Sequence, residues 1–278
     1  MSQSAVNTTS NTQTTAKPNP QVWYRPTFSP EHGVYVVLLV SFLIGAAAAQ
    51  AWKLATTLAL VCAFCGFQAE HPLVMQIKQR RSLKPRFLVW GGFYAVVSGA
   101  IALWLYFKYP LILWIYAGAI AALIVDTVSV LHREQKSIFN ELITFAAVCL
   151  SAPLAYVATT GTISAIALGL WALNTLYFSS TIFTVKLRKP KTSSLLPGMV
   201  YHAIATLIVT ALYWLGWLPA VAALAFGLAL LKFSFVAWNQ QLVSAAKIQF
   251  VAMLETGTAF AFLTIVALCV LPARLTIL

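Results

Sequence analysis

Two Glu-His dipeptides are the first candidates for chemistry in this sequence. The chain of 278 residues has only six acidic residues and four histidines, yet these types are adjacent at Glu31-His32 and at Glu70-His71. A carboxylate and an imidazole can share a proton, or together bind a divalent metal ion. The neighbouring prolines, Pro30 and Pro72, allow a second interpretation, in which both pairs are polar helix ends at the water line. The sequence leaves open a ligand site, a divalent metal site and this structural role.

Four more polar residues fall inside apolar runs: Asp126, Glu141, His202 and Glu255. A charge at membrane depth costs about 2.5–3.5 kcal/mol on insertion scales, so it normally faces a bundle interior or a watered cavity. Glu255 lies roughly 10 Å past the start of its run at 1.5 Å per residue, and is the main functional candidate. Glu141 could instead complement a helix dipole, Asp126 could bond Arg133 or Ser129, and His202 could lie near the headgroups.

Two basic segments are candidates for contact with a charged headgroup. They contribute Arg80, Arg81, Lys84 and Arg86 from KQRRSLKPR, and Lys186, Arg188 and Lys189 from KLRKPK. Arg and Lys could clamp a phosphate or diphosphate. They could equally anchor the protein to anionic lipids, so both interpretations stay open.

The elements that must position these residues are transmembrane helices. The chain is 60% hydrophobic and 9% charged, with a mean hydropathy of +0.83, whereas soluble domains have about 25% charged residues. This composition predicts an all-α polytopic membrane protein whose first partner is the lipid bilayer. Aromatic-interleaved motifs for nucleic acid are missing, so no nucleic-acid partner is expected. Nine apolar runs are candidate spans: 34–52, 54–69, 87–107, 111–130, 138–158, 163–185, 198–217, 219–236 and 248–272. The second is short and could extend further, toward Pro72.

The distribution of positive charge predicts the orientation. All Lys and Arg except Lys53, Lys108 and Arg274 fall on the side of the N-terminal tail, provided that Lys232 snorkels to that end of its helix. The positive-inside rule then places the N-terminus in the cytoplasm and the C-terminus outside. We expect residues 1–27 to be a disordered cytoplasmic tail and residues 28–278 to form a single bundle. All acids and histidines then lie at or near the cytoplasmic side, which predicts a polar cavity there.

Several stretches resemble the YwiC-like family of bacterial integral membrane proteins. They are RPTFSPEHGVYVVLL at 25–39, EHPL at 70–73, SIFNEL at 137–142, ALNTLYFSSTIFTVKLR at 172–188 and YHAI at 201–204. The family's P-K-E-H-G-A-W stretch before the first helix reads SPEHGVY here, with Pro30 in place of Lys and Tyr35 in place of Trp. The resemblance implies a location in the bacterial cytoplasmic membrane or in an internal photosynthetic membrane, and it implies no particular reaction.

The predicted architecture is also similar to that of UbiA-type prenyltransferases. Those enzymes have nine helices and hold Mg²⁺ and a prenyl diphosphate with Asp-rich loops after helices two and six, and SAPLAYVATTG at 151–161 is similar to their fifth helix. This chain has one Asp in total, Asp126, and the loop after its sixth span has no acid. Glu70 and His71 fall near the place of the first motif. The two-motif Mg²⁺ chemistry is therefore not carried over.

Three functional hypotheses follow. The first is a cytoplasm-facing cavity that binds or processes a lipophilic, isoprenoid or quinone-like ligand. Its polar end would meet Glu31, His32, Glu70, His71, His202 and Glu255. The second is a proton-coupled transporter that uses Asp126 and Glu255. The third is a non-catalytic assembly factor with unknown protein partners. Whether the protein is an enzyme is left open.

Overall fold

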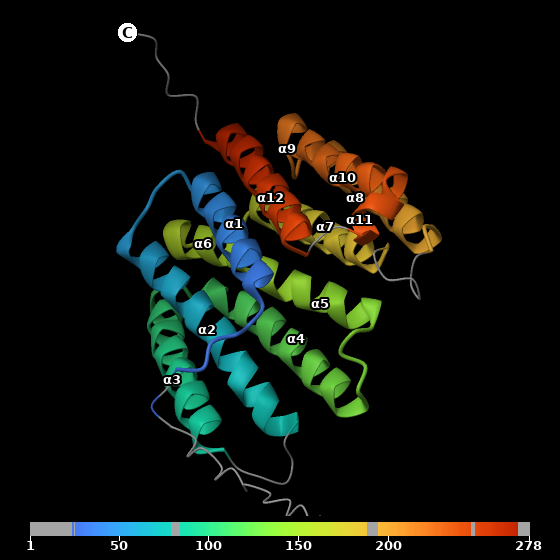
Figure 1. The fold of residues 1–278 in the computed structure, drawn as a ribbon. Coiled ribbons are helices and arrows are strands. Elements are labelled where there is room, and N and C mark those ends of the chain that lie inside the picture. The colour runs from blue at the N-terminus through green and yellow to red at the C-terminus, as the bar shows by residue number, and fades with distance from the viewer. Residues whose placement is uncertain (1–23, 25, 79–83, 188–193, 246–247, 272–278) are drawn as a thin grey trace, which may run out of the picture.

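The structure is a computed structural model that describes residues 24, 26–78, 84–187, 194–245 and 248–271 (Figure 1). The predicted tail, except for residues 24, 26 and 27, lies outside this described part. The helices are α1 (His32–Ala48), α2 (Leu54–Lys78), α3 (Pro85–Lys108), η1 (Pro110–Ile112), α4 (Leu113–His132), α5 (Ile138–Cys149), α6 (Ser151–Thr160), α7 (Ala165–Leu187), α8 (Leu196–Trp214), α9 (Ala220–Ala225), α10 (Gly227–Trp238), α11 (Gln240–Ala245) and α12 (Ile248–Val270).

The predicted spans are present as helices. Eight segments of the described chain are long and apolar enough to cross a membrane, with α5–α6 and α9–α10 each forming one of them, and α1 is a shorter apolar helix of 17 residues. The all-helical membrane fold of about nine spans is therefore confirmed. Most boundaries lie within a few residues of the prediction. The largest difference is α2, which continues through Pro72 to Lys78 instead of ending near 69.

Two spans are interrupted by a local change of hydrogen bonding. Pro153 has no N–H to donate to the carbonyl of Cys149, four residues earlier, so α5 ends there and α6 begins at Ser151. At the junction the N–H of Leu150 bonds to Ala147, three residues back. Phe226 makes the same kind of bond to Ala223 between α9 and α10. These tighter turns bend the spans without ending them.

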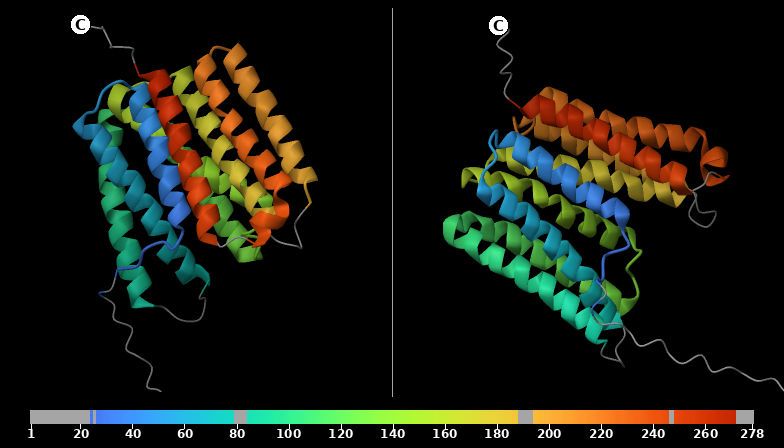
Figure 2. Two further views of the ribbon diagram at one scale, coloured as in Figure 1. Left: turned by 45° about the horizontal axis from the view of Figure 1, so that its top comes forward. Right: turned by 60° about the vertical axis from the view of Figure 1, so that its left-hand side comes forward.

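The first helix lies at the centre of the bundle. α1 packs against α6 on one side and α12 on the other, while α2 and α3 form a close antiparallel pair farther out. Figure 2 shows the same arrangement from two other directions, with α1 between the N-terminal helices and the C-terminal group α7–α12. A Cβ at Gly45 would lie 2.0 Å from the carbonyl oxygen of Ala152, so only glycine permits this approach of α1 to α6.

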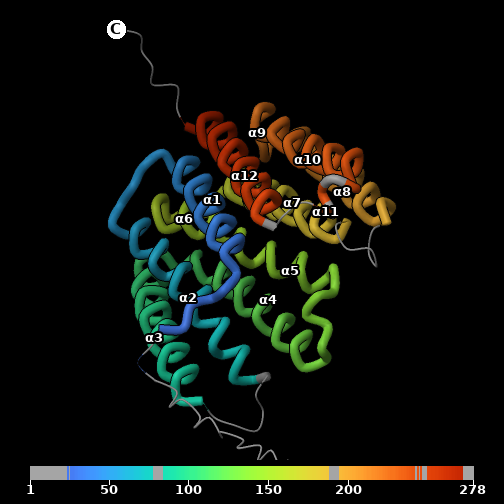
Figure 3. The backbone as a smooth tube through the Cα atoms, in the orientation of Figure 1, coloured from blue at the N-terminus to red at the C-terminus, as the bar shows by residue number. Residues whose placement is uncertain are grey.

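The two ends of the bundle differ in their connections. At one end, turns at 49–53, 161–164 and 215–219 join the helices, and Nε2 of Gln50 in the first turn donates to the carbonyl of Val270 at the end of α12. The connection 133–137 lies at the opposite end, named here the basic end because Lys136 and Lys186 lie there. Figure 3 shows the course of the backbone from one end of the bundle to the other. The assignment of the basic end to the cytoplasm remains a prediction from charge.

Candidate functional site

A cleft of about 550 Å³ opens between α1, α2, α4, α5 and α7 at the basic end. Its walls are apolar and include Phe67, Val148, Ile182 and Val185. Charged and polar side chains also line it: Glu31, Glu70, His71, Asp126, Gln135, Lys136, Asn140, Glu141 and Lys186. The cleft thus brings together five of the eight predicted ligand-site residues, which are Glu31, Glu70, His71, Asp126 and Glu141. An apolar hollow with a few convergent polar groups is the usual form of a small-molecule site.

Three carboxylates share one region of the cleft. Glu70 on α2 interacts electrostatically with Asp126 on α4 and with Glu31 before α1. Asp126 accepts a hydrogen bond of 2.8 Å from Nδ2 of Asn140 on α5. Neither Arg133 nor Ser129, the partners considered from the sequence, makes this bond. Asn140 was not among the predicted site residues, because an amide inside an apolar run carries no charge that would single it out.

A second polar contact joins α5 and α7 across the cleft. Nζ of Lys186 lies 2.7 Å from Oε2 of Glu141, and both side chains are partly exposed. Glu141 lies in the first turn of α5, where Oγ of Ser137 accepts from the N–H of Asn140 and caps the helix. The helix-dipole interpretation of Glu141 is compatible with this position, and the ion pair adds a tertiary role. Lys186 also donates to the carbonyl of Lys136.

The segment before α1 is fixed against α2 by a hydrogen-bonded network. The N–H of Ser29 donates to Oε1 of Gln68, and Nε2 of Gln68 donates to the hydroxyl of Tyr35. That hydroxyl donates in turn to the carbonyl of Ser29. The network holds Pro30 and Glu31 at the edge of the cleft. His32, the next residue, is exposed and lies outside the lining, beside the ring of Tyr35.

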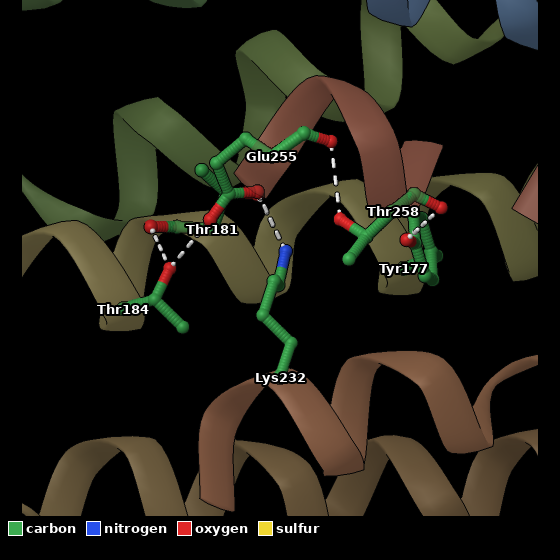
Figure 4. Close-up of polar contacts among 6 residues, drawn as sticks. All are labelled: Tyr177, Thr181, Thr184, Lys232, Glu255 and Thr258. Atoms are coloured by element: carbon green, nitrogen blue, oxygen red, sulfur yellow. Dashed lines mark hydrogen bonds and ion pairs between the residues drawn. The ribbon is translucent and has the colours of Figure 1, made fainter. Parts of the chain in front are cut away.

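Glu255 belongs to a separate buried group between α7, α10 and α12 (Figure 4). Its Oε2 lies 2.7 Å from Nζ of Lys232, whose side chain is 1% exposed, against 20% for Glu255. Thr181 donates to Oε2 and Thr184 to Oε1, at 2.8 and 3.1 Å. The prediction that Lys232 snorkels to the helix end is wrong, because its side chain turns inward to this carboxylate. The ring of Tyr177 adds a cation–π contact at 5.5 Å.

The cleft and this buried group meet at one side chain. Thr181 lines the cleft, donates to Glu255, and accepts a bond of 3.2 Å from Nζ of Lys232. Thr184 bonds the same carboxylate but does not line the cleft. The sequence did not identify Thr181, because α7 also carries Asn174, Thr175, Ser179 and Ser180, and so many polar residues do not single out one position.

His202 lies apart from the cleft, on the far side of the buried group. Its ring stacks on Phe233 with centroids 4.2 Å apart, and its Nδ1 is 2.7 Å from the carbonyl of Gly198. The side chain is buried, so the alternative of a headgroup contact does not fit. Its Nε2 has no hydrogen-bond partner among the described residues.

The remaining predictions concern headgroups and metal. Lys84 and Arg86 are described: the first lies over the ring of Phe87, and the second donates to the carbonyl of Pro26. Arg80, Arg81, Arg188 and Lys189 lie outside the described residues. Within the described residues, no group of three or more His, Cys, Asp or Glu side chains is arranged to hold a metal ion.

A protein-family match covers the part of the chain that supplies most residues of the cleft. Residues 28–156 match the YwiC-like protein family. The resemblance is thereby confirmed from before α1 into α6, including both Glu-His pairs, and the stretches at 172–188 and 201–204 lie beyond the match. No curated protein and no solved structure matches the chain. The likeness to UbiA-type prenyltransferases stays a prediction.

Proposed function

We propose that this YwiC-like membrane protein binds a lipophilic molecule in the cleft, with an isoprenoid or quinone-like body against the apolar walls. The observation that carries the proposal is the combination of apolar walls from α2, α5 and α7 with convergent polar groups from the segment before α1, from α2 and from α4. A volume of about 550 Å³ suits a small lipophilic ligand or the head portion of a longer one.

The charges of the lining favour a ligand whose polar end donates hydrogen bonds. Glu31, Glu70 and Asp126 offer carboxylate oxygens, which accept hydrogen bonds when ionised. A hydroxyl group of an isoprenoid alcohol or a quinol could donate to them. A diphosphate would lie close to these three acidic groups. Of the two lysines in the lining, Lys186 is already paired with Glu141, which leaves Lys136. The lining therefore favours a hydroxyl over a diphosphate at the bound end.

The test is to fill the cleft without disturbing the rest of the bundle. Val185→Trp places an indole in the cleft, whereas Val128→Trp, the matched control, changes an exposed valine of α4 that does not line it. The full-length protein is purified from its membrane, and the retained lipophilic compounds are identified by mass spectrometry. We expect a compound that co-purifies with wild type and with Val128→Trp and that is lost from Val185→Trp.

The polar end is tested separately with Glu70→Gln and Asp126→Asn. Each change keeps the side-chain shape and replaces a carboxyl group by a neutral amide, so a hydroxyl-bearing ligand should be retained about tenfold less well, the scale of one strong hydrogen bond. Equal retention by wild type, Val185→Trp and both charge variants would rule out the cleft as the binding site.

The alternative of a proton-coupled transporter has one supporting observation. The pair of Lys232 and Glu255 lies within membrane-spanning helices and touches the cleft through Thr181. Ionisable groups at such positions are often proton relays. Proton-dependent uptake that persists unchanged in Glu255→Gln would exclude this alternative.

A further inference from the structure

The buried group around Glu255 is not explained by ligand binding in the cleft. Lys232 and Glu255 come from α10 and α12, and α7 supplies two hydroxyl groups that complete the carboxylate's hydrogen bonds (Figure 4). The partners have unequal access: the lysine side chain is 1% exposed, and the glutamate side chain is 20% exposed. The carboxylate is thus the more accessible member of the pair.

Thr181 supplies a route between this carboxylate and the cleft. A hydroxyl group is both donor and acceptor, so it can pass a proton on. Thr181 occupies both roles here, since it donates to Oε2 of Glu255 and accepts from Nζ of Lys232. Because Thr181 also lines the cleft, its side chain alone connects the cleft to the carboxylate.

Polar side chains continue deeper along the same face of α7. Asn174, Tyr177, Thr181 and Thr184 follow one another at spacings of three or four residues, which places them in one row. Asn174 is fully buried, and neither its Oδ1 nor its Nδ2 has a hydrogen-bond partner in the described part of the chain. Buried amides are ordinarily satisfied, often by ordered water. The unsatisfied amide of Asn174 therefore marks a position in the row that suits a bound water molecule.

We propose that Glu255, paired with Lys232, is a proton-exchange group inside the membrane, reached from the cleft through Thr181. A proton from cleft water adds to a carboxylate oxygen of Glu255 and ends the ion pair, leaving Lys232 as an ammonium ion over the ring of Tyr177. Return of the proton to water restores the pair. The proposal concerns exchange with the cleft and does not depend on which molecule the cleft binds.

The groups that face Glu255 set this equilibrium. Lys232 on α10 and the hydroxyl groups of Thr181 and Thr184 on α7 contact its carboxylate oxygens. Tyr177 on α7 also interacts electrostatically with it. On α8, His202 interacts electrostatically with Lys232. Protonation of Glu255 ends the ion pair with Lys232, and it loosens α12 from α7 and α10.

The experiment is infrared difference spectroscopy of the full-length protein in lipid nanodiscs. Lowering the pH should produce a carboxylic acid C=O band that is absent from Glu255→Gln. Because Glu255→Gln leaves Lys232 unpaired, the assignment is repeated with the neutral double variant Lys232→Met/Glu255→Gln. If the low-pH spectra of wild type and the double variant superimpose, Glu255 takes up no proton and the proposal is overturned.

The route is tested by deuterium exchange of that band after transfer to heavy water. Thr181→Val and its control Thr184→Val each remove one hydroxyl donor to Glu255, but only Thr181 lines the cleft. We expect Thr181→Val to slow the exchange about fivefold or more, the factor of one hydrogen bond, and Thr184→Val to leave it near the wild-type rate. Equal slowing in both variants would refute the route through Thr181. Neither readout requires a bound ligand, so failure of the proposed ligand site would leave these results unaffected.

Discussion

Lys232 and Glu255 make the most buried ion pair of the described structure, and each depends on the other. Removing one partner of a buried pair leaves an uncompensated charge, which costs more than the intact pair contributes. The surrounding hydroxyl groups cannot replace the opposite charge, because Thr181 and Thr184 are neutral donors. The pair therefore fixes how α10 and α12 meet α7.

We predict that Lys232→Met lowers the unfolding free energy of the protein by about 3 kcal/mol, the range for one member of a buried pair. The double variant Lys232→Met/Glu255→Gln should recover most of this loss, because it carries no unpaired charge. Thermal unfolding of the purified protein measures both. The control Lys186→Met breaks the more exposed pair with Glu141 and should cost less than about 1 kcal/mol. Equal losses in Lys232→Met and Lys186→Met would contradict the prediction.

For single residues, the sequence predicts which polar side chains are unusual, but it does not predict which residues they contact. Intramembrane acids such as Glu255 and Asp126 are rare enough to be recognised from the sequence. Their partners come from other helices: Lys232 from α10 and Asn140 from α5. Which face of a helix meets which neighbour is decided by packing. For this reason Lys232 was expected at the water line and His202 near headgroups, and the structure buries both.

The elements themselves follow closely from hydropathy, since a span needs roughly 20 apolar residues. Hydropathy fails where polar residues continue a helix. Glu70, His71 and Gln76 lower the apolar character of 70–78, yet α2 continues through them to Lys78. Pro72 inside this helix is tolerated, as it often is in membrane helices. The extension matters for the site, because the end of α2 supplies one wall of the cleft.

The contact of α1 with α6 gives a prediction at the scale of elements. Gly45→Ala would bring a methyl group against the backbone of Ala152, and backbone cannot move aside as a flexible side chain can. We expect it to destabilise the protein by about 1–3 kcal/mol, as overpacking does. Gly99→Ala in α3 is the matched control, since a Cβ there would have nothing within 4 Å. It should be neutral or stabilising by up to about 1 kcal/mol.

Thermal unfolding distinguishes the two glycine variants. If Gly45→Ala were as stable as Gly99→Ala, α1 and α6 would have to be farther apart than the structure has them. The contact is also held by the hydroxyl of Ser151, which donates to the carbonyl of Leu38 at 3.1 Å. Ser151→Ala should therefore weaken the same interface by about 1 kcal/mol.

For the whole molecule, orientation is the main expectation that rests on sequence alone. Eight spans of the described chain together with the shorter helix α1 would place the two termini on opposite sides of the membrane. The excess of Lys and Arg at the basic end predicts that this end faces the cytoplasm. We predict that a fluorescent protein fused to the N-terminus is bright in the cytoplasm and that alkaline phosphatase fused to the C-terminus is active. The opposite pattern would place the cleft on the outer side.

The family match covers one side of the candidate cleft and not the other. The matched residues 28–156 include Glu31, Glu70 and Asp126, which form the acidic region of the cleft. The other wall of the cleft, with Thr181 and Lys186, belongs to α7, beyond the match. The cleft is thus complete only when both halves of the chain are packed together, which the apolar pattern of either half does not reveal.

The central place of α1 has a consequence for biosynthesis. α1 leaves the ribosome well before α12, yet the two pack together, and Gln50 bonds to Val270 at their shared end. One flank of α1 must therefore stay without its native neighbour until α12 has been synthesised. A chain released before α12 would present that flank to lipid or to membrane-protein quality control. Truncation before α12 should therefore destabilise the packing of α1 in the bundle.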